Sequence, residues 1–214
     1  TKTEFPRALL NSLMIAFLTT VCCLLISILG SYAMTRLKYP GRRFFKTSII
    51  FSYLIPTAVL FVPMYVFVSK LGFYDNKWAL LIIYPTTVVP YCCYMLMSYF
   101  KAIPYALEEA ALIDGCTRMK SLRYIITPIA LPGIAVVATF AFTMSWNEYL
   151  YAMIMTTSPA QQTAVVAISS FKYADSAIWG RIMAASVLTS LPVTIIYIVA
   201  QAQLISGKSD GSVK

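Results

Sequence analysis

The sequence predicts an all-α fold, a polytopic transmembrane bundle of about five helices with a short helix pair on one side of the membrane. One observation behind this class is composition. Of the 214 residues, 59% are hydrophobic and only 12% are charged, about half the charged share of an ordinary soluble domain. The second observation is the spacing of the charged residues, which leaves five long stretches of the chain without a charged side chain.

The uncharged stretches are long enough to cross a membrane as helices. A helix needs roughly 20 residues to span the hydrocarbon layer, and lipid permits only helices or closed barrels because it offers the backbone no hydrogen-bond partner. Barrel strands are about 10 residues long and alternate in polarity, whereas these stretches are longer and apolar on both faces. The predicted spans are residues 8–34, 47–69, 78–100, 128–155 and 182–206.

Several prolines fall inside three of these spans. Membrane helices tolerate proline because neighbouring helices and waters satisfy the freed carbonyls. We therefore expect a plain kink at each position, with a gating hinge as the alternative. The prolines concerned are Pro56, Pro63, Pro85, Pro90 and Pro192.

The net charge of +9 comes from basic residues in loops between spans. The charges do not gather on one face, which argues against a nucleic-acid partner. Cytoplasmic loops carry the excess of Lys and Arg, and the basic loops here follow the first, third and last spans. This rule places the C-terminus in the cytoplasm and the N-terminus outside. The basic residues are Arg36, Lys38, Arg42, Arg43, Lys46, Lys101, Arg118, Lys120, Arg123, Lys208 and Lys214.

An outside N-terminus leads us to expect a further span ahead of residue 1. The chain begins Thr1-Lys2-Thr3-Glu4, without an initiator Met. It also lacks a charged-then-apolar signal segment before the first span. We therefore expect the full-length protein to have one more apolar stretch.

Residues 104–126 form a cytoplasmic segment that predicts two short helices joined by a bend. Glu108 and Glu109 suit the early turns of a helix, where the helix dipole favours acids. Gly115 suits the position just after its end. Residues 117–126 predict a second, amphipathic helix. The segment could act as a lever for a partner, or it could be a solvated surface helix.

The spacing in this segment resembles the EAA loop of bacterial ABC importer permeases. A Glu-Ala-Ala triplet is followed by three residues, a Gly, and then an Ile and a Pro. A later Trp-Asn-acid triplet is similar to a motif of the carbohydrate branch. The resemblance covers nearly the whole chain and is strongest to the maltose-transporter G-type subunits, which have one span more than is predicted here. The matching residues are Glu109, Ala110, Ala111, Asp114, Gly115, Ile125, Pro128, Trp146, Asn147 and Glu148.

The resemblance implies an ATP-driven, binding-protein-dependent sugar importer in the bacterial cytoplasmic membrane. In that family the loop docks on an ATPase, and closure of two ATPases moves the spans. The implied partners are two ATP-binding subunits, a second permease (a different chain) and an extracytoplasmic solute-binding protein. ATP and Mg would bind to the ATPases, so no cofactor is expected in this chain. The implied coupling residues are Glu108, Glu109, Ala110, Ala111, Asp114 and Gly115, with Glu109 meeting a basic group.

Four residues are candidates for contact with solute or binding protein: Asn11, Trp146, Asn147 and Glu148. The last three could line an outer cavity or form an interfacial anchor. Asn11 could bond to solute or join helices. The polar loop 156–180 matches a loop that reaches into the sugar-binding protein in maltose-type relatives, although it could be an inert connector.

Other cargoes and other classes of protein are the alternatives. Glycerol phosphate, an amino acid or a metal could replace the sugar within the same class. An ion-coupled carrier usually needs several intramembrane ionisable groups and internal repeats, whereas only Glu148 is available. A membrane enzyme is disfavoured because the chain has no His and no nucleophile–base pair. We predict no catalytic residue and no metal ligand.

Overall fold

The computed structural model describes residues 4–171 and 179–209, and within these ranges the regular elements are all helices. The all-α prediction is confirmed. Among the described residues, three helices are long and apolar enough to cross a membrane, and two bent helix pairs raise the number to five if each pair is one span. The three are α1 (Phe5–Arg36), α4 (Leu80–Ala102), preceded by the short η1 (Lys77–Ala79), and α11 (Trp179–Ser209).

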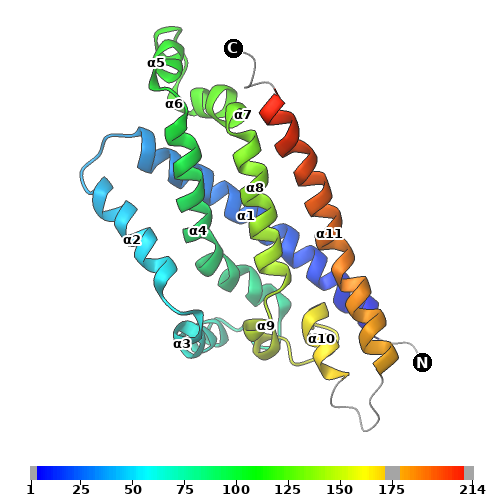
Figure 1. Ribbon diagram of the computed structural model, residues 1–214. Helices are drawn as coiled ribbons and strands as arrows, with labels where there is room; N and C mark the ends of the chain where they lie inside the picture. Colours follow the sequence, from blue (N-terminus) through cyan, green and yellow to red (C-terminus); the bar gives the residue numbers. More distant parts are fainter. Residues whose placement is uncertain (1–3, 172–178, 210–214) are drawn as a thin grey trace.

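Helix α1 crosses the whole bundle and packs against α4 and against α8 (Leu131–Trp146) (Figure 1). Its buried stripe is made mainly of small residues at steps of three or four, which places them on one helix face. Small side chains let helix backbones approach closely in a membrane, where lipid removes the hydrophobic drive for association. The small and polar members of the stripe are Ala8, Ser12, Ala16, Thr19, Cys23, Ser27, Ser31 and Thr35.

The predicted span 47–69 is wrong as a continuous helix. The structure has α2 (Arg42–Leu54) and α3 (Thr57–Lys70), bent by 98° at the break between them. Pro56 explains the break, because it lacks an N–H and it disfavours helical backbone in the preceding residue. Ile55 accordingly has the extended angles φ −71° and ψ 122°. The other four prolines lie inside helices that continue past them.

The predicted span 128–155 is also wrong as a single helix. The helical segment Arg118–Ile129, whose last part is α7 (Thr127–Ile129), meets α8 at an angle of 82°. Helix α8 ends at Trp146, and α9 (Leu150–Met155) follows as a separate element. The interruption lies at Asn147, Glu148 and Tyr149, which sequence hydropathy alone did not separate from the span.

The two ends of the bundle carry different elements (Figure 1). One end holds α5 (Tyr105–Ile113), α6 (Arg118–Ser121), η2 (Leu122–Ile126) and the end of α11. The opposite end holds α3, α9, α10 (Ala164–Ser170) and the start of α1. The ends of α1 and α4 and the start of α8 therefore meet the segment 104–126 at one end.

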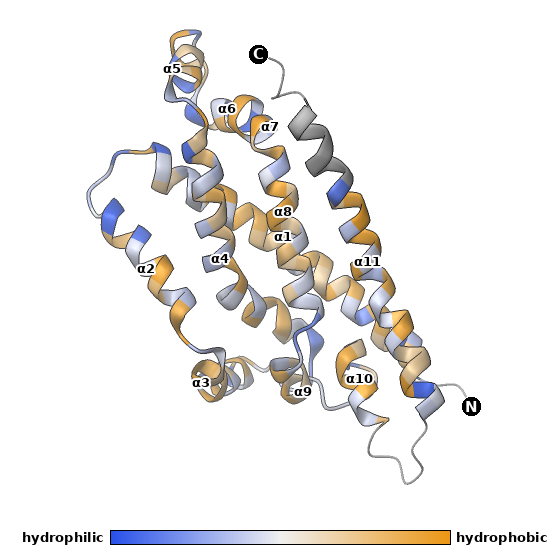
Figure 2. Cartoon of the chain, viewed as in Figure 1, coloured by the Kyte–Doolittle hydropathy of each residue, from blue (hydrophilic) through white to orange (hydrophobic). Residues whose placement is uncertain are grey.

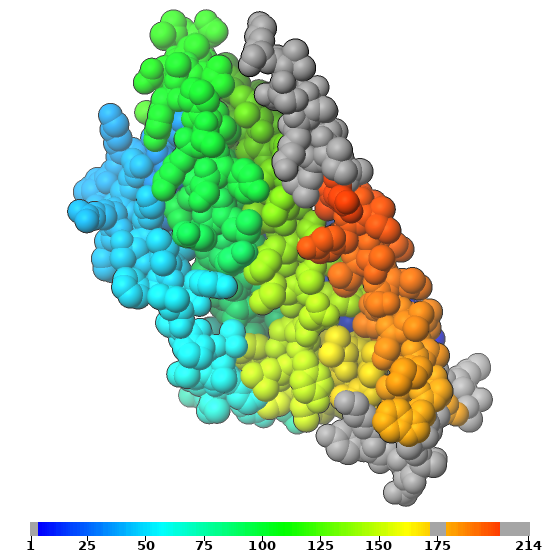
Figure 3. All heavy atoms as spheres, in the orientation of Figure 1, coloured from blue at the N-terminus to red at the C-terminus, as the bar shows by residue number. Residues whose placement is uncertain are grey.

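The flanks of the bundle are apolar, and the described residues of the chain do not cover them. Helix α2 has no buried residue, and only 6% of the most apolar window of α11 is buried. Figure 2 shows apolar residues along both helices, and Figure 3 places them on opposite flanks of the molecule. Lipid or a partner chain must cover surfaces of this kind.

Candidate functional site

Helix α5 stands off the end of the bundle and is closed by a glycine bend. Gly115 has a φ of +83°, a left-handed conformation that favours glycine. Its N–H donates to the carbonyl of Leu112 (3.2 Å), and the N–H of Cys116 donates to the carbonyl of Ala111 (2.9 Å). This pair of bonds is the Schellman ending of a helix. The predicted bend at Gly115 is present.

The stretch after the bend differs from the amphipathic α-helix predicted over 117–126. Helix α6 begins after Thr117, whose side chain accepts a hydrogen bond from the Lys120 N–H. The chain then widens into the π-helical turn η2, a rare element found most often at functional positions. Leu122 and Ile126 of this turn are buried in one core cluster with residues of α1, α4 and α8. The segment is therefore rooted in the bundle.

The two alanines of the Glu-Ala-Ala triplet do not form one small face. Ala110 is exposed and Ala111 is only 4% exposed, because successive residues on a helix point in different directions. Glu109 is exposed, as are Asp114 and Gly115.

The exposed surface of this segment also carries large apolar side chains that the sequence analysis did not single out. The exposed fractions are 44% for Leu107, 86% for Ile113 and 60% for Met119. They stand close in sequence to the charged coupling candidates. These side chains are candidates for a contact with a partner, which a contiguous exposed apolar patch would mark.

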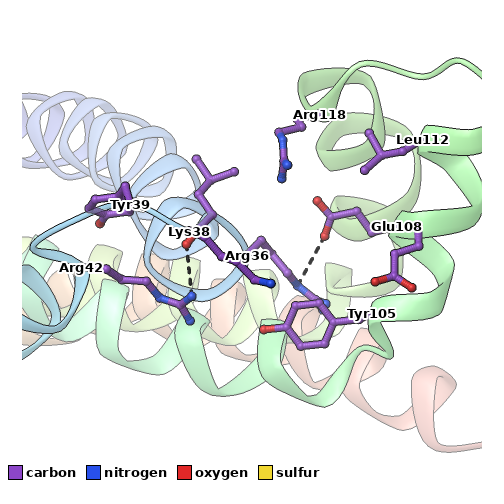
Figure 4. A pocket seen from close by; sticks show the side chains of 10 residues that line it. Arg36, Lys38, Tyr39, Arg42, Tyr105, Glu108, Leu112 and Arg118 are labelled. Carbon is purple, nitrogen blue, oxygen red and sulfur yellow. Dashed lines mark hydrogen bonds and ion pairs between the residues drawn. The ribbon is translucent and has the colours of Figure 1, made fainter.

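Glu108 is not available at the surface, unlike the other acids of the segment. Its side chain is 6% exposed, and its Oε2 lies 3.7 Å from Nε of Arg36, whose side chain is 1% exposed (Figure 4). The hydroxyl of Tyr32 donates to Glu108 Oε1 at 2.5 Å. The structure therefore places Glu108 in a buried contact with α1 and not on the exposed surface of the segment.

Arg36 joins the ends of three helices. Its Nη2 donates to the carbonyls of Phe100 (2.5 Å) and Ile103 (2.6 Å) at the end of α4. Its guanidinium carbon lies 4.2 Å from the ring centroid of Tyr105. The Tyr105 hydroxyl in turn donates to the carbonyl of Thr35 (2.8 Å). We call Tyr32, Arg36, Tyr105 and Glu108 the joint, because together they tie α5 to α1 and α4.

The sequence analysis missed this joint. It treated Arg36 as one of several loop cations that set topology, although Arg36 is 5% exposed. The one available signal was position, since Arg36 ends a long apolar helix, where a cation can neutralise carbonyls. Its carboxylate partner lies 72 residues further along the chain, which no local pattern reveals.

Asn147 and Glu148 line a cavity of about 430 Å³ between the two helix breaks. Both carboxylate oxygens of Glu148 accept backbone N–H groups at the start of α9, from Tyr151 at 3.0 Å and Ala152 at 3.1 Å. Glu148 therefore caps α9, which explains why an acid is tolerated here. The hydroxyl-bearing residues that line the cavity are Ser52, Tyr53, Thr57, Tyr84, Thr86, Thr87, Ser145, Tyr149 and Tyr151.

Trp146 and Asn11 lie apart from this cavity. Trp146 is 2% exposed and stacks on Phe142 with ring centroids 5.5 Å apart. Asn11 is 3% exposed, and its amide donates to the carbonyls of Ala160 (3.1 Å) and Gln162 (3.0 Å). Its Oδ1 accepts from Lys77 Nζ at 2.7 Å. The structure thus places Asn147 and Glu148 in one cavity, places Trp146 with Asn147 in the lining of a second cavity of about 410 Å³, and places Asn11 against the loop after α9.

This loop is held from a second direction by Asp75. The Ser158 backbone N–H donates to Asp75 Oδ1 at 2.8 Å, and the Ser158 hydroxyl donates to Oδ2. These hydrogen bonds lower the pKa of the Asp75 carboxyl below 3.8, its usual value. Residues 172–178, which belong to the predicted loop 156–180, lie outside the described residues.

Comparison with known proteins identifies the family to which this chain belongs. The chain belongs to the family of binding-protein-dependent transport system inner membrane components, whose model matches residues 26–208. It is 37% identical to the inner membrane ABC transporter permease protein YcjP of Escherichia coli, over 95% of this chain and 73% of that protein. It is 34% identical to the trehalose/maltose transport system permease protein MalG of Thermococcus litoralis, over 99% and 76%.

Solved structures share the fold. A chain of a bacterial ABC transporter involved in the import of alginate has a TM-score of 0.81 at 23% identity, over 94% of this chain and 76% of that chain. A chain of the MetNI methionine transporter in an inward-facing conformation has a TM-score of 0.74 at 18% identity, over 95% and 96%. These likenesses show that the chain shares its helical fold with membrane subunits of solved transporters.

Proposed function

We propose that this chain is a permease subunit of an ATP-driven, binding-protein-dependent sugar importer, in which segment 104–126 transmits the motion of partner ATPases to the spans. The observation that carries the proposal is the glycine-bent helix α5, exposed at its tip and tied at its base to α1 and α4 by the joint. A partner that moves α5 would thereby move both helices. The names of relatives in the family, which include transporters of trehalose, maltose and diacetylchitobiose, support a sugar cargo.

The exposed members of the coupling set form the proposed ATPase contact. Glu109 meets a basic group of the ATPase, and the exposed side chains of Leu107, Ile113 and Met119 fill apolar depressions beside it. Two ATP-binding subunits hydrolyse ATP, and this chain binds neither ATP nor Mg. The end of the bundle that carries α5 and the end of α11 faces the cytoplasm.

The remaining partners cover the other surfaces. A second permease, encoded by a different chain, packs on an apolar flank, and the solute-binding protein docks at the end that carries α9 and α10. The cavity beside Asn147 and Glu148 lies on the solute path, where its hydroxyl and carboxylate groups can exchange hydrogen bonds with a sugar. Glycerol phosphate is a weaker second candidate, because the described residues that line the cavity include the carboxylate of Glu148 and no Lys or Arg.

Reconstitution tests the proposed function. The complete transporter, with its binding protein, is placed in vesicles and supplied with radiolabelled disaccharides, glycerol phosphate or amino acids. We expect uptake of a saccharide that requires ATP on the α5 side. Uptake driven by an ion gradient without ATP would refute the proposal, and ATP-driven uptake of an amino acid alone would refute the sugar cargo.

A further inference from the structure

A cationic groove lies beside the joint, where α1 ends and α2 begins. It consists of two pockets of about 890 and 570 Å³ that share Tyr39 and Arg42, the larger of which is shown in Figure 4. Glu108 is already engaged by Arg36, which leaves an excess of positive charge. The charged residues that line the groove are Arg36, Lys38, Arg42, Arg43, Lys46, Arg118, Glu108 and Glu109.

Three features of the groove favour an anion. The Nη1 of Arg36 is buried without a hydrogen-bond partner, although the residue lines the larger pocket. Helix α2 begins after Gly41, which supplies no side-chain acceptor for the first backbone N–H groups. The smaller pocket is lined by Arg42, Arg43 and Lys46, with no carboxylate among the described residues that line it.

We propose that this groove binds the phosphate headgroup of an anionic phospholipid from the leaflet at this end of the bundle. Basic pockets between membrane helices bind such headgroups. The residues of α2 next to the groove are exposed and aromatic, with exposed fractions of 71% for Phe44, 55% for Phe45 and 63% for Phe51. The acyl chains of a lipid can pack on this aromatic face. A free phosphate ion has no apolar part that could cover it. Only the naming of this leaflet as cytoplasmic rests on the proposed function.

A bound headgroup would touch both sides of the joint. One wall of the larger pocket comes from the α1–α2 connection through Lys38 and Tyr39, and the other comes from α5 through Tyr105 and Glu109. An anion held between the walls neutralises Lys38 and Arg118 across the gap. Anionic lipid would therefore steady α5 against α1 and α2.

Native mass spectrometry of the complete, detergent-purified transporter tests this site. The complex is titrated with phosphatidylglycerol or with phosphatidylcholine, and retained lipids are counted. The test variant is Arg43→Gln/Lys46→Gln, which spares the arginines that bond to backbone carbonyls. The control is Arg7→Gln/Lys70→Gln, which removes the same charge from exposed residues at the other end of the bundle. We expect the test variant to retain several-fold less phosphatidylglycerol and the control to match the wild type.

Each other outcome overturns the lipid site. Equal retention of phosphatidylglycerol by the two variants would show that the groove does not hold it. Complete displacement of the lipid by millimolar inorganic phosphate would show a site for a free anion. Loss of the ATPase subunits from the test variant, without a change in lipid, would show a subunit contact. ATP-dependent uptake by the same preparations tests the proposed function separately, because it can fail while lipid retention follows the expected pattern.

Discussion

Replacing Glu108 by Gln removes the charge from the joint and leaves its shape nearly unchanged. The Gln side-chain oxygen can still accept the hydrogen bond from the Tyr32 hydroxyl, which is 2.5 Å from Glu108 Oε1 in the wild type. The ion pair with Arg36, at 3.7 Å between two side chains that are 1% and 6% exposed, is lost. The guanidinium of Arg36 then remains buried with the two α4 carbonyls and the Tyr105 ring as partners, none of which carries a negative charge.

The size of the effect follows from the geometry. At an effective dielectric constant near 20, two unit charges at this separation attract by about 4 kcal/mol. Desolvation offsets part of the attraction, but removing one partner of a buried pair costs about 3–5 kcal/mol because the other charge is left uncompensated. Since Arg36 keeps two carbonyl partners, we expect a loss of about 3 kcal/mol in the free energy of unfolding.

Two measurements on the purified, reconstituted transporter check this prediction. The thermal midpoint of the Glu108→Gln variant should fall by several degrees, as expected from roughly 2–4 °C per kcal/mol for a chain of this size. Solute imported per ATP hydrolysed should fall severalfold, because a weakened joint lets α5 move without moving α1 and α4. ATPase subunits should remain bound, since Glu108 lies below the exposed contact surface.

The matched control is Glu4→Gln, which removes the same charge from an exposed residue at the other end of the bundle. Its thermal midpoint should stay within the small range typical of surface substitutions. If Glu108→Gln leaves both the midpoint and the import-to-ATP ratio at their wild-type values, the joint does not transmit motion and the reasoning is wrong.

Three further predictions test local features of the fold. Gly115→Val should lower import per ATP through backbone strain of about 1–2 kcal/mol, because Gly115 has a φ of +83°. No atom lies within 4 Å of an added Cβ, so the effect comes from strain and not from a clash. Import per ATP at the wild-type level would contradict this. Gly133→Ala should lower the thermal midpoint by the equivalent of about 1–3 kcal/mol, because its Cβ would lie 2.4 Å from the Tyr99 ring, whereas Gly180→Ala, in open space, should not. Because the pKa of Asp75 is lowered in the folded protein, its carboxylate stabilises the fold above pH ~4. This contribution disappears as the pH falls through the lowered pKa. The difference in thermal midpoint between wild type and Asp75→Asn should therefore shrink over that acid range.

The sequence by itself determined the class of fold and the position of the bent segment. Long uncharged runs can satisfy their backbone in lipid only as helices, so the spans around α1, α4 and α11 were predictable from composition. Gly115 was predictable because a helix that ends in a left-handed residue favours glycine. These features depend on neighbours in the chain, which a sequence displays directly.

Only the tertiary structure decided where the spans bend and which charges pair. Pro56 breaks its helix while Pro63, seven residues later, does not, because each outcome depends on the helices that pack around it. Arg36 and Glu108 have no local pattern in common, and only the packing of α5 against α1 brings them within 3.7 Å. A buried charge has a role only through the particular groups that compensate it, and those groups come from distant parts of the chain.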